Sequence, residues 1–135
     1  GHYKPQGHIS VEVEDENVLI AGDVICNNII PPIAAGGELD KLLETLKMLQ
    51  YKNYSVIIPG HGEVVENDLI FKRQFEYLNN AKSKIEELLR NGGKMTDLSK
   101  IKLTDCIEDT SYLYEMQLDY LHKQTLMIIY RQLKK

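Results

Sequence analysis

The chain has 135 residues and a mass of 15.5 kDa, the size of one ordinary domain, and 43% of its residues are apolar, enough for a compact core. Its 20 acidic and 16 basic residues give a formal net charge of −4, which argues against a nucleic-acid-binding protein, because such surfaces are usually basic. No apolar run approaches the roughly 18 residues of a membrane span, and the first residues lack the apolar core of a signal peptide.

The cysteine content is only weakly informative. Cys26 and Cys106 lie far apart in the sequence and show no Cys-x-x-Cys spacing. We therefore expect two reduced thiols rather than a disulfide or a cysteine-based zinc site. Together with the lack of a membrane span or signal peptide, this predicts a cytoplasmic protein that contacts no membrane.

The first predicted element is a β-hairpin. Over residues 8–14 apolar and polar residues alternate, which is the period of a half-buried strand. A turn over 15–17 follows, and the continuous apolar run 18–21 predicts a more deeply buried second strand. This strand should end at Gly22-Asp23.

A helix and a further strand are predicted next. The stretch 30–37 is rich in proline and glycine and cannot form a regular helix. Over residues 38–50 leucines recur at helical spacing on one face. Residues 55–58 then read as a short buried strand, closed by Pro-Gly-His-Gly over 59–62. The resulting order ββαβ is typical of an α/β fold.

The remainder of the chain is predicted to be helical. A long helix should begin at an N-cap on Asn67 and end at Asn-Gly-Gly over 91–93, since glycine readily adopts the left-handed C-cap conformation. A short helix is expected over 96–100. A last helix should begin at Asp109 or Ser111 and run nearly to the final residue.

Two polar side chains follow buried strands and are the strongest candidates for chemistry. Asp23 follows the second strand through a glycine, and His61 follows the third through Pro-Gly. Ligands of open α/β sheets gather beyond the carboxyl ends of strands, and a carboxylate with an imidazole suits a divalent metal. Glycines at positions 22, 60 and 62 allow the backbone to turn sharply beside a bound ion.

The order of these elements resembles a known family. Gly-His, then Gly-His-Ile-Ser, a short hairpin, Gly-Asp-Val, a loop and helix, and Ile-Pro-Gly-His-Gly follow one another. Residues 2–66 thereby resemble the carboxy-terminal half of the metallo-β-lactamase superfamily. The resemblance implies an α/β fold in which residues 1–66 form half of an αββα sandwich, from a β-hairpin, a helix and a strand. Residues 67–135 would be a helical carboxy-terminal extension packed on it.

The resemblance also implies a paired metal centre, usually of zinc and sometimes of iron or manganese. Asp23 would bridge the two ions, and His61 would bind the second of them. His2 would bind the first ion, as the histidine of the family's Gly-His-Thr-Pro-Gly-His/Ser element, which is two residues longer here.

The remaining histidines and the loop after Asp23 receive other roles. His8 would lie at the edge of the site without binding metal, and His122 is expected to be a surface or packing residue of the last helix. The loop over 24–37 leaves the metal-bearing strand end, so we expect it to form part of the substrate pocket. His8, Asn27 and Asn28 are the candidates for substrate contact, the alternative being that the asparagines only form turns.

The family's first metal-binding element, His-x-His-x-Asp-His, does not occur in this sequence, whose histidines are at positions 2, 8, 61 and 122. A complete centre needs more ligands than these. We therefore expect a fragment or one half of a split enzyme, with a missing amino-terminal half as its partner.

The complete site would perform metal-assisted hydrolysis of a small-molecule substrate, because paired divalent ions lower the pKa of a bound water from near 16 to about 7. Substrates of the family include β-lactams, thioesters, lactones and phosphodiesters, and the sequence does not choose among them. Two alternatives stay open. One is an inactive binding or assembly module on the same scaffold, and the other is an iron-dependent redox member of the superfamily.

The apolar surface predicts self-association. The last helix carries apolar residues on more than one face, including the run 126–130. The sheet would lack the second sheet that the family packs against it, and an uncovered sheet face invites pairing with another chain. We expect a two-fold homodimer. The alternative is a monomer in which the last helices fold back over that face.

Overall fold

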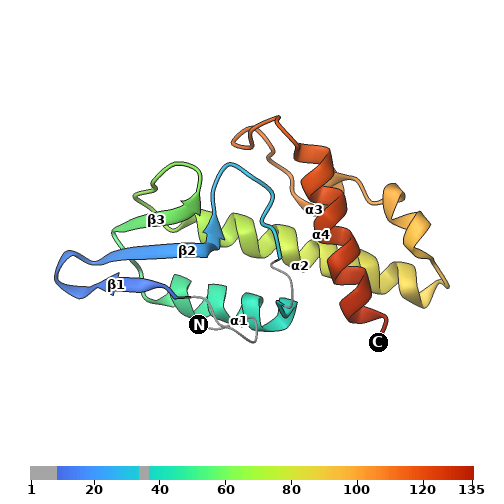
Figure 1. Cartoon of the computed structure of the whole chain (residues 1–135), viewed down its shortest axis with the longest axis horizontal. Helices are drawn as coiled ribbons and strands as arrows, with labels where there is room; N and C mark the ends of the chain where they lie inside the picture. The colour runs from blue at the N-terminus through green and yellow to red at the C-terminus, as the bar shows by residue number, and fades with distance from the viewer. Residues whose placement is uncertain (1–8, 34–36) are drawn as a thin grey trace.

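The computed structural model describes residues 9–33 and 37–135 of the chain. They form a small sheet followed by a helical region, with the amino-terminal elements at one end of the molecule and the carboxy-terminal helix at the other (Figure 1). The elements in chain order are β1 (Val11–Val13), η1 (Glu14–Glu16), β2 (Val18–Cys26), α1 (Leu39–Tyr51), β3 (Val56–His61), α2 (Leu69–Arg90), η2 (Met95–Lys100), α3 (Leu103–Cys106) and α4 (Leu118–Leu133).

The sheet has the strand order β1-β2-β3. β1 pairs antiparallel with β2, which confirms the predicted hairpin, and β2 pairs parallel with β3. The parallel pairing matters for the site, because it brings the carboxyl ends of β2 and β3 to the same edge of the sheet. The α/β class is confirmed, while the half-sandwich arrangement and the division at residue 66 stay predictions.

One face of the sheet is buried. Leu19 and Ile57 face each other in register and are fully buried. They join a single core with the leucine face of α1 and the apolar face of α2, two helices that pack against each other. The predicted leucine stripe therefore lies in the same core as the buried face of the sheet. The strand residues that alternate with Leu19 and Ile57 point to the opposite face of the sheet.

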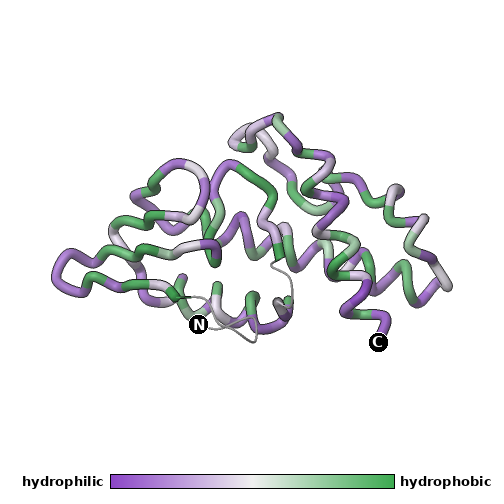
Figure 2. Tube along the Cα trace, in the orientation of Figure 1, coloured by the Kyte–Doolittle hydropathy of each residue, from purple (hydrophilic) through white to green (hydrophobic). Residues whose placement is uncertain are grey.

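That opposite face is apolar and open. Val11, Ile20 and Ile58 lie side by side across the three strands and are 49%, 41% and 37% exposed. Figure 2 shows the contrast between the apolar strands and the polar tip of the hairpin. Among the described residues, the carboxy-terminal helices do not cover this face, since α4 packs against α2 and η2.

Both site-bearing strands run further than predicted. β2 was expected to end at Asp23 but continues to Cys26, and β3 includes His61 rather than stopping at residue 58. Register shifts after Ile20 and after Gly22 make the added part of β2 irregular. Local apolar patterning does not predict these pairings, because glycine and aspartate break the pattern.

The predicted start of the last helix is wrong. α4 begins at Leu118, because the preceding residues are held in turns. The Asp109 carboxylate accepts hydrogen bonds from the backbone N–H and the hydroxyl of Ser111, and Gln117 adopts the left-handed conformation with φ of 59°. Such side-chain bonds compete with helix formation.

The other helices lie close to their predicted positions. α2 begins at Leu69, whose N–H donates to the side chain of Asn67, and ends before Gly92, which has φ of 75° as expected for a C-cap glycine. The short helix η2 is of the 3₁₀ type, and α3 was not predicted. Within the described parts of the chain, no helix is both long and apolar enough to cross a membrane.

Candidate metal centre

The structure brings Asp23 and His61 together at the carboxyl edge of the sheet. The Asp23 Oδ1 and His61 Nε2 atoms are 3.4 Å apart, and each side chain is 56% exposed. This distance is longer than the roughly 2.7–3.2 Å of an N–H···O hydrogen bond. The two side chains thus face each other with an oxygen and a nitrogen donor accessible from solvent.

Gly60 allows this close approach. A Cβ atom at Gly60 would lie 2.5 Å from Asp23 Oδ1 and 2.6 Å from the carbonyl of Gly22. Gly22 itself has φ of 59°, a conformation that side-chain-bearing residues rarely adopt. The glycines that the sequence placed beside the two ligands are therefore needed for backbone contact between the strands.

The irregular end of β2 is held by a residue that the sequence analysis missed. Gln74 of α2 is buried, and its Nε2 donates to the Val24 carbonyl at 2.7 Å while its Oε1 accepts from the Cys26 N–H at 3.0 Å. These two bonds satisfy backbone groups on either side of Ile25, within the irregular part of the strand. A glutamine within the apolar stripe of α2, between Phe71 and Leu78, is the feature that could have revealed it.

Asn27 and Asn28 are buried and bonded within the chain. Asn27 Nδ2 donates to the Glu63 carbonyl at 3.0 Å, and Asn28 Oδ1 accepts from the Glu63 N–H at 3.0 Å. The turn that follows His61 is thus fixed from both sides. The geometry supports the alternative of a structural role for both asparagines, and their contact with substrate stays a prediction.

The pair of donors fits zinc, but two ligands do not complete a site. Two donors about 2.1 Å from a tetrahedral zinc ion lie about 3.4 Å apart, which is the separation of the Asp23 and His61 atoms. No group of three or more metal-binding side chains occurs among residues 9–33 and 37–135. His2 and His8, the expected third ligand and the site-edge residue, lie outside the described residues.

His122 is remote from this edge and is a packing residue rather than a surface residue of α4. It is buried, its Nδ1 lies 2.7 Å from the Tyr77 hydroxyl, and its Nε2 lies 3.0 Å from the Ile101 carbonyl. Because a carbonyl only accepts, Nε2 carries the proton and Nδ1 accepts from Tyr77. Both ring nitrogens are therefore used inside the helical region.

The cysteines are free, as expected, and both are buried. Burial, with a smaller contribution from the charge of Asp23, raises the pKa of the Cys26 thiol to about 12. Burial likewise raises the pKa of Cys106, to about 11. Both thiols are therefore protonated at neutral pH in the metal-free chain.

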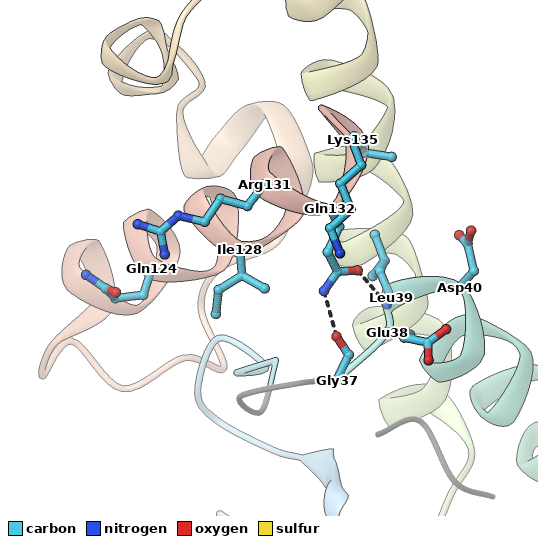
Figure 3. Close-up of a pocket in the computed structure, with 10 residues that line it drawn as sticks. Gly37, Glu38, Leu39, Asp40, Gln124, Ile128, Arg131, Gln132 and Lys135 are labelled. Carbon is cyan, nitrogen blue, oxygen red and sulfur yellow. Dashed lines mark hydrogen bonds between the residues drawn. The ribbon is translucent and has the colours of Figure 1, made fainter. Parts of the chain in front are cut away.

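A cavity of about 790 Å³ lies elsewhere, between the start of α1 and helix α4 (Figure 3). Gln132 crosses it, with Nε2 donating to the Gly37 carbonyl at 2.6 Å and Oε1 accepting from the Leu39 N–H at 2.9 Å. Neither Asp23 nor His61 lines this cavity. Gly37, at the end of the expected pocket loop, faces it instead of the metal-binding edge.

The comparison with protein families decides the relationship of the first part of the chain. Residues 1–61 match the family model of the Metallo-beta-lactamase superfamily. The match contains Asp23 and ends at His61, and it confirms the resemblance over these residues, which are fewer than half of the 135. No curated protein matches the chain. The superfamily consists mostly of hydrolases and generally binds metal ions.

Proposed function

We propose that residues 9–61 supply Asp23 and His61 to the zinc centre of a metallo-β-lactamase-like hydrolase. The observation that carries this proposal is the pair itself. An imidazole nitrogen and a carboxylate oxygen lie 3.4 Å apart at the shared end of two parallel strands, inside the matched segment. The open position beside them is the arrangement of a catalytic rather than a structural metal.

The remaining ligands come from a second segment that carries the family's His-x-His-x-Asp-His element. The open face of the sheet, formed by Val11, Ile20 and Ile58, is the surface on which this partner sheet packs. Its apolar character suits face-to-face sheet packing, in which side chains of the two inner faces interdigitate. The chain alone therefore holds zinc weakly and has no hydrolase activity of its own.

The chain's own residues set the geometry of the centre. Asp23 and His61 provide the two donors, Gly60 permits their approach, and Gln74 fixes the backbone that directly follows Asp23. A metal pair supplies Lewis-acid activation of water and of the substrate's carbonyl or phosphoryl oxygen. The substrate is a small molecule with a hydrolysable bond, such as a thioester, lactone, lactam or phosphodiester.

The proposal is tested by zinc titration of the chain and of two variants. We expect weak binding by the unmodified chain, and a loss of at least about tenfold in affinity in Asp23→Ala and in His61→Ala, because each removes one of two donors. Asp40→Ala removes an exposed carboxylate of α1 that pairs with Lys82, so it serves as the matched control and should leave the affinity unchanged.

Tight stoichiometric zinc binding that survives both Asp23→Ala and His61→Ala would contradict the proposed centre. Binding that weakens equally in the Asp40→Ala control would also contradict it, because the zinc would then be held by surface carboxylates in general.

A further inference from the structure

Asn28 lies between two segments that are far apart in the sequence. It follows the end of β2, adopts the left-handed conformation with φ of 61°, and is only 7% exposed. On one side of it runs the turn over 61–63, which carries His61. On the other side runs the loop over 109–114 of the helical extension, drawn in orange beside the β2–α1 connection in Figure 1.

Asn28 bonds to both segments at once. Its Oδ1 accepts from the Glu63 N–H at 3.0 Å, and its Nδ2 donates to the Tyr112 carbonyl at 2.8 Å. Its backbone carbonyl also accepts from the Tyr114 N–H at 2.7 Å. One buried amide therefore joins the His61 turn to the extension, and each of its two ends has a different partner.

The turn on the metal side has little freedom to move independently. The Asn27 N–H donates to the His61 carbonyl at 2.9 Å, and Asn27 Oδ1 accepts from the Asn28 N–H at 2.9 Å. A side chain at Gly62 would overlap the Asn27 carbonyl. A displacement of Asn28 is therefore transmitted to the backbone of His61.

The extension side is also ordered by its own contacts. Asp109 holds Ser111 in a turn through two hydrogen bonds. The Arg73 guanidinium of α2 stacks on the Tyr112 ring, with 4.0 Å between the guanidinium carbon and the ring centroid. The loop thus offers Asn28 a fixed carbonyl and a fixed N–H rather than a mobile chain.

We propose that Asn28 is a positioning residue through which the loop over 109–114 holds the His61 turn in its ligand geometry. The helical extension is then part of the metal centre's support. The part of this inference that concerns metal rests on the proposed function. By thermodynamic linkage, zinc bound at His61 must stabilise the loop over 109–114 to the same extent that the loop favours zinc binding.

Two substitutions separate the two ends of the amide. Asn28→Gly tolerates the left-handed conformation and removes both side-chain bonds. Asn28→Asp keeps an acceptor for the Glu63 N–H but places a carboxylate oxygen against the Tyr112 carbonyl. Asn53→Gly is the matched control, because Asn53 is also a left-handed asparagine, with φ of 57°, and lies in the exposed turn between α1 and β3.

The readout is amide-resolved hydrogen exchange of Glu63 and Tyr114 in the full chain. We expect Asn28→Gly to speed exchange of the Glu63 amide by about tenfold or more, the effect of losing one net hydrogen bond. The Tyr114 amide keeps its acceptor, the backbone carbonyl of Asn28, but should also exchange faster because its loop loses the bond from Asn28 Nδ2 to the Tyr112 carbonyl. Asn28→Asp should speed exchange of the Tyr114 amide alone. Exchange of the Glu63 amide should stay slow, because the aspartate still offers it an acceptor oxygen. Asn53→Gly should change neither, and amides of α2 report whether each variant is folded.

Zinc provides the second arm. Saturating zinc should slow exchange of Tyr114 in the unmodified chain and in Asn53→Gly, but not in Asn28→Gly. If Asn28→Gly leaves Glu63 exchange unchanged while α2 stays protected, or if zinc binds without slowing Tyr114, the inference is overturned. If the unmodified chain binds no zinc, the proposed function fails, and the exchange of Glu63 and Tyr114 in the two variants still decides whether Asn28 joins the segments.

Discussion

Gly60 determines how closely the end of β3 approaches Asp23. Its missing side chain leaves the space that the Asp23 carboxylate and the Gly22 carbonyl occupy. Gly62 makes the other close contact of the site, where it packs against the carbonyl of Asn27. At the scale of single residues, the metal-binding edge therefore depends on positions with no side chain as much as on the two donors.

Gly60→Ala should separate the donors. The added Cβ must displace either Asp23 or the backbone of Gly22, so we expect a loss of about 1–3 kcal/mol in the free energy of unfolding, as for overpacking in general. Zinc affinity should fall as well, because the separation of the Asp23 and His61 atoms changes. Chemical denaturation and zinc titration measure the two effects.

Gly92→Ala is the control for this substitution. Gly92 has φ of 75° but open space around its Cβ position, so alanine there strains the backbone far from the site. It should lower stability without changing zinc affinity. Unchanged zinc affinity in a folded Gly60→Ala variant would show that the approach of β3 to Asp23 is not needed for the centre.

The residue types at the site were predictable, and their supports were not. Asp23 and His61 are recognisable in sequence because each follows a buried strand through glycine, and the parallel pairing of β2 and β3 brings them together. The roles of Gln74 and Asn28 depend on hydrogen bonds to residues 35 to 84 positions away. No local period encodes such contacts.

At the scale of elements, a buried polar pair joins the helices of the extension to one another. Tyr77 of α2 donates to His122 of α4, and His122 donates to the carbonyl of Ile101, directly after η2. Three elements therefore meet at one imidazole. The arrangement suits a neutral ring. A protonated ring has two N–H groups, so Tyr77 would have to accept from Nδ1 and its own hydroxyl proton would lose its acceptor.

Acid should weaken this junction. Burial lowers the pKa of His122 below its ordinary value of 6.5, although the Ile101 carbonyl and the carboxylates of Asp119 and Asp105 oppose the shift. The unfolded chain thus binds a proton more readily than the folded one, so the stabilisation is present above about pH 6.5 and declines as the pH falls below it.

Thermal denaturation of the chain and of His122→Gln at pH 7.5 and pH 5 checks this. Glutamine has a donor and an acceptor but does not titrate. The Tm of the variant should therefore fall by fewer degrees on acidification than the Tm of the unmodified chain. Equal losses in the two proteins would show that His122 does not titrate on unfolding.

The elements differ in how well the sequence predicted them. The hairpin and α1 follow from local periods of apolar residues, and α1 was found close to its predicted bounds. The hairpin strands differ more, because β1 covers only Val11–Val13 of the predicted 8–14 and β2 continues to Cys26. The start of α4 was misplaced because Asp109 and Asn28 hold the preceding residues in turns. Those contacts override a helical pattern that is present in the residues themselves.

At the scale of the whole molecule, the open sheet face is the dominant surface feature. Val11, Ile20 and Ile58 form a continuous apolar strip, and Ile9 and Val13 add to it. A partner sheet covers this strip in the complete protein, under the proposed function. Among residues 9–33 and 37–135 no element covers the strip, and a second copy is a partner of matching chemistry.

The isolated chain should therefore form a two-fold dimer. Sedimentation equilibrium at micromolar concentration should show a species of twice 15.5 kDa. Ile20→Lys places a charge at the centre of the strip and should shift the equilibrium to monomer, because burying an unpaired charge is costly. Met48→Lys changes an exposed apolar residue of α1 and should not. A monomer of 15.5 kDa without concentration dependence would reject the dimer.

The central claim is that Asp23 and His61 together hold a metal ion, and an anomalous difference map from zinc-soaked crystals of the chain tests it most directly. We predict a peak within about 2.0–2.2 Å of both an Asp23 carboxylate oxygen and His61 Nε2. A well-occupied zinc ion bound elsewhere, with no density between these two side chains, would contradict the account.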